Sequence, residues 1–143
     1  MILNIRHTGI VVKNLEASID FYTKKLGFNI KVQSEEDSGF IDTILGLENS
    51  DLITVKLSLN DGAMIELLDF KSDTINIPKR HIVDTGPTHM AFTVDDLDDT
   101  YQSFLKDGIQ FISTPQITPD GFAKVAFCSA PEGSYIELVE LLK

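Results

Sequence analysis

The sequence predicts an α+β fold made of two tandem βαβββ modules, and two internal repeats support this prediction. The stretch from His7 to Leu15 matches the stretch from His89 to Leu97, at a distance of 82 residues. Further along, Gly62 and Gly133 each follow an acidic residue and open a segment that contains Ile-Glu-Leu at the same offset. A repeated opening strand and a repeated closing strand indicate an internal duplication, with extra residues in the first copy.

Length and composition are those of a globular protein. With 143 residues, 43% hydrophobic and 24% charged, the chain is long enough for one domain with its own core. We expect a single domain over residues 1–143, with modules at 1–70 and 87–143 joined by a linker at 71–86. The formal net charge of −10 argues against nucleic acid and anionic membranes as partners.

The single cysteine and the lengths of the apolar runs indicate the cellular compartment. Cys128 is the single cysteine, so an internal disulfide is excluded and a reducing compartment is favoured. It lies among apolar residues, which indicates a small core residue and not a nucleophile. The first five residues are too short for a signal sequence, and no apolar run has transmembrane length. We therefore expect a cytoplasmic protein.

In the first copy, alternation predicts a strand over residues 5–12. Asn14 is a suitable N-cap for a helix from residue 15 to about residue 25, and Gly27 is its expected stop. A second strand is predicted over 28–32, and a hairpin over 52–59 and 63–70. The extra segment 39–47 is predicted to be a short helix with Phe40, Ile44 and Leu47 on one side. We interpret it as additional core or a subunit contact; a lid is the alternative.

The second copy repeats this order. A strand over 88–94 is followed by a helix that Asp95 or Asp96 caps and Gly108 ends. We expect a short strand at 109–113, a proline-containing loop at 114–121, and closing strands at 124–128 and 135–142. Between the copies, a basic cluster at 79–81 is interpreted as a solvated loop; the alternative is a contact for an anionic substrate group.

Each copy contributes one histidine and one glutamate to the same strand face. Because strands alternate their faces, His7 and Glu66 are expected on the inner face of the first copy, and His89 and Glu137 on that of the second. A charged group among apolar neighbours is costly unless it is paired or binds a metal. Imidazole and carboxylate suit zinc, nickel, cobalt, iron or manganese. Four such residues at matching positions favour a site for one divalent ion.

The chain resembles the vicinal-oxygen-chelate superfamily, which includes glyoxalase I, methylmalonyl-CoA epimerase, extradiol dioxygenases and the bleomycin- and fosfomycin-resistance proteins. The segment 15–22 with Leu26-Gly27-Phe28 resembles the family's first helix, and Pro131-Glu132-Gly133 with Ile136-Glu137-Leu138 its closing hairpin. The resemblance covers the whole chain and implies a glyoxalase-like fold. It also implies that the family's four metal positions fall on His7, Glu66, His89 and Glu137.

The ligand pattern resembles glyoxalase I most closely. That resemblance implies a lyase or isomerase that transfers a proton through a metal-stabilised enediolate, with a ligand glutamate as the base. We expect Glu137 in this role and Glu66 as the second candidate. Many glutathione-using members carry an arginine four residues after the first histidine. Here that position is Val11, so the substrate stays open.

Other functions remain open at this point. An acyl-CoA epimerase uses similar ligands, whereas dioxygenases and fosfomycin-type transferases use two histidines and one carboxylate, which would make Glu66 surplus. A non-catalytic protein that binds an antibiotic or another small molecule is the alternative from a different class. The family also implies a homodimer, an assembly that is common among soluble proteins.

Overall fold

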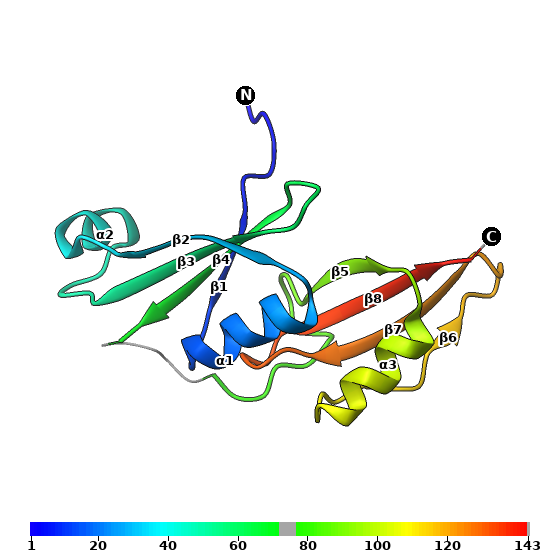
Figure 1. Ribbon diagram of the computed structural model, residues 1–143. Coiled ribbons are helices and arrows are strands. Elements are labelled where there is room, and N and C mark those ends of the chain that lie inside the picture. Colours follow the sequence, from blue (N-terminus) through cyan, green and yellow to red (C-terminus); the bar gives the residue numbers. More distant parts are fainter. Residues whose placement is uncertain (72–76, 143) are drawn as a thin grey trace. The chain divides into compact units, whose positions relative to one another are not determined.

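The computed structural model describes residues 1–71 and 77–142 (Figure 1). The chain divides into two compact units, Met1–Asn76 and Ile77–Lys143. Residues 72–76 of the predicted linker lie outside the described residues. We call the two parts the first and the second unit and describe each by itself.

The first unit is one four-stranded sheet with its helices. Its elements are β1 (Thr8–Val11), α1 (Leu15–Asp20), the π-helix η1 (Phe21–Lys25), β2 (Asn29–Glu35), α2 (Ser38–Leu45), β3 (Leu52–Ser58) and β4 (Met64–Phe70). The strand order is β1-β4-β3-β2, with β1 parallel to β4 and the other pairs antiparallel.

The second unit repeats this topology. Its elements are β5 (His89–Val94), α3 (Leu97–Lys106), β6 (Gln116–Ile117), β7 (Ala123–Ser129) and β8 (Tyr135–Leu141). The strand order β5-β8-β7-β6, with β5 parallel to β8, has the same pattern as the first sheet. The prediction of an α+β fold with tandem βαβββ modules is confirmed.

One face of the first sheet is turned toward α1, and one face of the second sheet is turned toward α3. In the first unit Ile65 and Leu67 of β4 are buried on the side of α1, and in the second unit Ile136 and Leu138 of β8 are buried on the side of α3. The Glu140 carboxylate confirms this orientation, because it accepts a hydrogen bond of 2.9 Å from the backbone N–H of Leu97 at the start of α3. We call the opposite face of each sheet, turned away from α1 or α3, the distal face.

The helices begin where the sequence predicts. Asn14 accepts a hydrogen bond of 3.0 Å from the backbone N–H of Ala17, and Asp96 one of 2.9 Å from that of Asp99. These side chains satisfy backbone donors that a helix leaves unpaired at its first turn. Gly27 adopts a φ of 75°, which explains the stop after η1. The predicted helix over 15–25 is confirmed in extent, but its second half is a π-helix.

Two predicted strand boundaries and the predicted position of one strand were wrong. β1 begins at Thr8, so His7 lies just before the strand, and β2 extends to Glu35 instead of ending at residue 32. No strand forms over 109–113, where Phe111 makes only an isolated bridge to Cys128. The edge strand is instead β6, inside the segment expected to be a loop. Two residues between Pro115 and Pro119 suffice for an edge strand, which tolerates flanking prolines.

The helix α2 is present, but a different side chain anchors it. Ile41 is 6% exposed, whereas Phe40 and Ile44 are 59% and 57% exposed. Phe40, Ile44 and Leu47 therefore do not add to the core of the first unit, and the other interpretation of this segment, a subunit contact, stays a prediction. The period-3.6 spacing correctly identified an apolar stripe, but spacing alone does not determine which stripe packs on the sheet.

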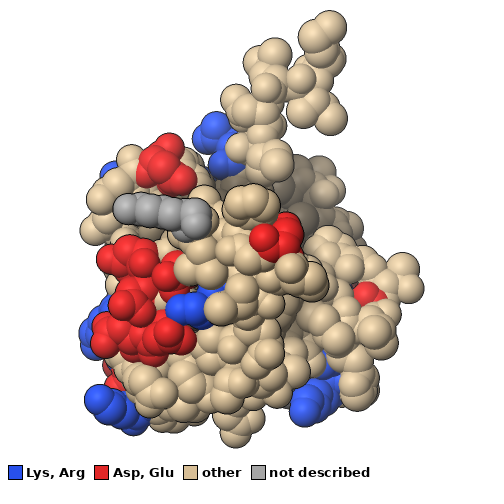
Figure 2. Space-filling view, turned by 90° about the vertical axis from the view of Figure 1, so that its right-hand side faces the viewer, with Lys and Arg blue, Asp and Glu red and all other residues tan. Residues whose placement is uncertain are grey.

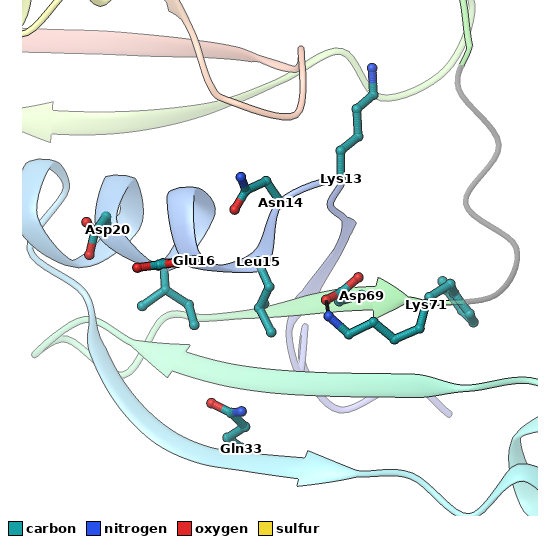
Figure 3. Close-up of a pocket in the computed structure, with 10 residues that line it drawn as sticks. Lys13, Asn14, Leu15, Glu16, Asp20, Gln33, Asp69 and Lys71 are labelled. Atoms are coloured by element: carbon teal, nitrogen blue, oxygen red, sulfur yellow. Dashed lines mark ion pairs between the residues drawn. The ribbon is translucent and has the colours of Figure 1, made fainter.

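A carboxylate lies at matching positions on the helix-facing side of both sheets, and each unit neutralises it differently. Asp69 of β4 is 5% exposed and forms an ion pair with Lys71, two residues further along the chain (Figure 3). At the corresponding position of β8, Glu140 pairs with Lys124 of β7 at 3.2 Å. Lys124 also pairs with Asp98 at 2.8 Å, and Asp98 and Glu140 together raise the pKa of this lysine.

Three further features concern the single cysteine, the charged surface and the helices. Cys128 is fully buried, and burial raises the pKa of its thiol to about 12, so the prediction of a small core residue is confirmed. Figure 2 shows Asp and Glu side chains gathered on the face that it displays. Among the described residues, no helix is both long and apolar enough to span a membrane.

Candidate metal centre

Each unit holds one histidine beside one glutamate on its distal face. In the first unit, His7 Nε2 lies 3.9 Å from Glu66 Oε1. In the second unit, His89 Nε2 lies 3.3 Å from Glu137 Oε2. In both units the glutamate is the third residue of the closing strand, and the parallel pairing β1–β4 or β5–β8 brings the histidine next to it. The duplication therefore produces two equivalent imidazole–carboxylate pairs.

The first pair has a third, cationic member. Lys56 of β3 lies directly opposite Glu66 in the antiparallel register, and its Nζ is 3.4 Å from Glu66 Oε2. Gly9 of β1 is the register partner of Glu66 on its other side. The two oxygens of Glu66 thus face different partners, one the imidazole of His7 and the other the ammonium of Lys56.

The second pair has apolar surroundings. Phe127 of β7 lies opposite Glu137, at the position that Lys56 fills in the first unit. Its ring contacts the His89 imidazole edge to face, with the ring centroids 5.1 Å apart. The Oγ1 atom of Thr88 lies 3.0 Å from His89 Nδ1, within hydrogen-bond distance. Such a bond at one ring nitrogen fixes the orientation of the imidazole and directs the other nitrogen at Glu137.

The donor types of both pairs suit a divalent ion, and the spacing of the second pair fits one. Ligands at about 2.1 Å from a metal lie about 3 Å apart when they occupy neighbouring coordination positions, which matches the His89–Glu137 pair. The His7–Glu66 distance is wider, with Lys56 on the far side of the carboxylate. His7 Nδ1 is buried and has no hydrogen-bond partner among the described residues, so His7 lacks the orienting contact that Thr88 provides for His89.

The four residues do not form one cluster within either unit. Over residues 1–71 and 77–142, no group of three or more His, Cys, Asp or Glu side chains is close enough to hold a metal. The reason is the duplication itself, because His7 and Glu66 belong to the first unit and His89 and Glu137 to the second. The structure brings the predicted residues together as two pairs, and the four-ligand site stays a prediction.

Lys56 and Phe127 were not predicted as part of the site, although the sequence contains a signal for both. The hairpin around Asp61 places residues 56 and 66 at equal distances from the turn, and the hairpin around Glu132 does the same for residues 127 and 137. Extending the two predicted hairpins by register would have placed a lysine beside one glutamate and a phenylalanine beside the other.

The basic cluster at 79–81 is not uniformly solvated, contrary to expectation. The Arg80 carbonyl accepts a hydrogen bond of 2.9 Å from the hydroxyl of Tyr135, a neighbour of His89 in the sheet register. Arg80 Nε is buried without a hydrogen-bond partner in the described part of the chain. His81, in contrast, is an exposed loop residue whose backbone N–H donates to Asp84.

A groove of about 790 Å³ lies elsewhere in the first unit, between α1 and the helix-facing side of its sheet (Figure 3). Lys13, Glu16, Gln33 and the Asp69–Lys71 ion pair line it. The groove therefore contains both positively and negatively charged side chains. It does not include His7 or Glu66 and is therefore separate from the candidate metal centre.

Known proteins resemble the chain over nearly its whole length. Among proteins with similar sequences, the uncharacterized protein YwbC of Bacillus subtilis is 28% identical over 142 residues, which are 98% of this chain and 99% of YwbC. A lactoylglutathione lyase of Pseudomonas aeruginosa is 26% identical over 144 residues, which cover 94% of this chain and 80% of the lyase.

Solved structures share the fold. A glyoxalase family protein from Bacillus cereus superimposes with a TM-score of 0.91 at 21% identity, covering 100% of this chain and 97% of its own. The antibiotic binding protein TnmS3 from a Streptomyces species gives a TM-score of 0.66 at 17% identity, covering 99% and 98%. At these identities the likeness concerns the fold alone.

The family is shown by a match to residues 4–138 of this chain, which include all four residues of the candidate metal centre. The chain therefore belongs to the Glyoxalase/Bleomycin resistance protein/Dioxygenase superfamily.

Proposed function

We propose that this protein is a divalent-metal-dependent lyase or isomerase of the glyoxalase I type that acts on a small molecule. His7, Glu66, His89 and Glu137 would hold one nickel, zinc, cobalt, manganese or iron ion. The observation that carries the proposal is the imidazole–carboxylate pair at the same register of each sheet. A bound ion would supply a Lewis acid to two adjacent substrate oxygens.

Proton transfer and the orientation of the ligands are assigned to residues of the chain. Glu137 is the proposed base, because its register partner on β7 is the apolar Phe127 and its carboxylate is 23% exposed. It would accept the proton from the substrate carbon and return it to the neighbouring carbon. Glu66 is the second candidate, but the Lys56 ammonium already faces one of its oxygens. The histidines would orient the ligand set, with His89 held by Thr88.

This function requires all four ligands around one ion, so the two imidazole–carboxylate pairs must lie close together. Joining the units as one domain through the linker at 71–86 would bring them together within a chain, and a homodimer would allow them to meet between chains. We propose the homodimer as the assembly in which the centre works.

Metal analysis tests the proposal directly. We expect purified wild-type protein, loaded with nickel or zinc and freed of excess ion, to retain about one ion per chain. His89→Ala should weaken metal binding more than about tenfold, since losing even an outer-shell partner weakens metal sites about 10- to 100-fold. Elemental analysis and competition with a chromophoric chelator provide the readout.

His81→Ala is the matched control, because it removes the other histidine of the second unit without touching the pair. Equal metal affinity in His89→Ala and His81→Ala would contradict the ligand assignment. The loaded wild type should then catalyse solvent deuterium exchange with some members of a panel of α-hydroxycarbonyl and acyl-CoA compounds. Those results would separate a glyoxalase-type enzyme from an epimerase.

A non-catalytic binding protein is the second candidate, and Lys56 is the observation that favours it. Its ammonium neutralises Glu66 without any metal, so this pair does not require an ion for its burial. This candidate predicts a protein that takes up no stoichiometric metal and binds an apolar drug. The metal analysis therefore decides between the two functions.

A further inference from the structure

Lys56 is a cation placed at the candidate metal centre by the register of the first sheet. Its Nζ lies 3.4 Å from Glu66 Oε2, and its side chain is 34% exposed. Charge-assisted hydrogen bonds between nitrogen and oxygen measure about 2.7–2.9 Å, so this pair is loose. The ammonium therefore keeps donors available for another oxygen at the same place.

The sheet itself does not require a lysine here. The corresponding position opposite Glu137 in the second unit is occupied by Phe127, and the strands pair in the same register in both units. The lysine is thus a difference between two halves that share strand order and register, located where each half presents its carboxylate. Such a difference points to recognition of a ligand and not to the formation of the fold.

The charges of the proposed centre support an anionic ligand. A divalent ion is balanced by the two carboxylates, and neutral histidines add nothing. With Glu66 engaged by the ion, the ammonium of Lys56 has no other ion-pair partner among the described residues, which leaves one positive charge uncompensated there. In a partly buried site an uncompensated charge is unfavourable, and a ligand that carries one negative charge beside its chelating oxygens would neutralise it.

We propose that Lys56 is a specificity-determining residue that binds an anionic group of the substrate beside the metal. The substrate class would be small carboxylates with an adjacent hydroxyl or carbonyl oxygen. This inference rests on the proposed function. In the structure the lysine pairs with Glu66; with an ion held by Glu66, the ammonium would be available to bind the substrate carboxylate.

The test compares a charged chelator with its neutral counterpart. Lactate and lactamide have nearly the same shape and both offer two adjacent oxygens, but only lactate carries a charge. Both are titrated into the cobalt-loaded protein, and the change in the visible cobalt spectrum gives their dissociation constants. Because a metal alone also favours lactate, the quantity of interest is how the lactamide-to-lactate ratio of dissociation constants changes between variants.

We expect Lys56→Met to lower this ratio about tenfold, which corresponds to about 1.4 kcal/mol. Lys56→Arg should retain most of the ratio, since it keeps the charge. Lys31→Met is the matched control, because Lys31 lies on β2 at the irregularity between Ile30 and Val32 and is not in register with Glu66. This control should leave the ratio unchanged.

The outcomes separate the inference from the function on which it rests. Wild-type protein that takes up no cobalt overturns both. A cobalt-loaded Lys56→Met variant with the wild-type ratio overturns the inference alone. If Lys56→Met does not fold or load, Lys56→Gln replaces it; failure of both variants to load identifies Lys56 as a structural residue and also overturns the inference.

Discussion

Glu137 and Glu66 occupy equivalent positions but have different neighbours, and this difference decides their proposed roles. Phe127 lies opposite Glu137, whereas Lys56 lies opposite Glu66. The ammonium of Lys56 already pairs with one oxygen of Glu66, whereas the phenyl ring opposite Glu137 offers its carboxylate no hydrogen-bond donor. Equivalent ligands in the two halves are therefore not expected to be equivalent in proton transfer.

Replacing Glu137 with glutamine tests this assignment. Glu137→Gln should leave the fold intact and lower solvent deuterium exchange about 100- to 10,000-fold, the range typical of a lost general base. The measurement is exchange of an active substrate, followed by NMR, in protein with verified metal content. Glu66→Gln, tested in parallel, should retain more exchange. Full activity of loaded Glu137→Gln would exclude Glu137 as the base.

At the residue scale, the sequence predicts each imidazole–carboxylate pair. It does not predict how the two pairs are placed with respect to each other. Internal repetition identified His7, Glu66, His89 and Glu137, because equivalent strands place equivalent side chains on one face. Hairpin register could also have identified Lys56. Strand periodicity does not determine where one pair lies with respect to the other, because alternation acts within a single sheet.

At the element scale, α2 is the clearest addition to the repeated topology. Ile41 fixes it to the first unit, and Asp37 caps it by accepting a hydrogen bond of 2.8 Å from the backbone N–H of Phe40. Gly46 ends the helix with a φ of 68°. One buried side chain and two helix-end signals thus hold a helix whose other apolar side chains are exposed.

This arrangement predicts a large difference between two isoleucines of the same helix. Ile41→Ala should lower the free energy of unfolding by about 2–4 kcal/mol, because it leaves a cavity. Ile44→Ala, at 57% exposure, should change it by less than about 0.5 kcal/mol. Urea unfolding followed by circular dichroism measures both. A comparable loss in Ile44→Ala would show that this side of α2 is buried in the assembled protein.

Most elements could be predicted because their signals are local. Caps, glycine stops and hairpin turns act within a few residues, and they correctly located α1, α3 and the pairs β3–β4 and β7–β8. The edge strand β6 could not be predicted in this way. Its two residues form a strand because they pair with backbone N–H and C=O groups at the edge of β7. The position of that edge depends on the tertiary structure.

At the scale of the whole molecule, the homodimer remains the prediction to measure. The chain has a mass of 15.9 kDa, so a dimer should give about twice that value by light scattering across a range of concentrations. Symmetric dimers are the most common assembly of soluble proteins. A stable mass of 15.9 kDa at micromolar concentration would contradict the prediction and would require the two pairs to meet within a single chain.

The different lysines of the two units have a consequence for exchanging segments between them. Asp69 has its cation on its own strand segment, at Lys71, whereas Glu140 relies on Lys124 from the neighbouring strand. If the segment carrying β8 were copied over that of β4, Glu140 would face Ile53, the register partner of Asp69, and its own chain would bring Leu142 in place of Lys71. The transferred carboxylate would then be partly buried without a cation, a strongly destabilising arrangement. The reverse copy would carry its own lysine. The two segments are therefore not interchangeable with respect to this ion pair, because the β4 segment carries its own cation and the β8 segment does not.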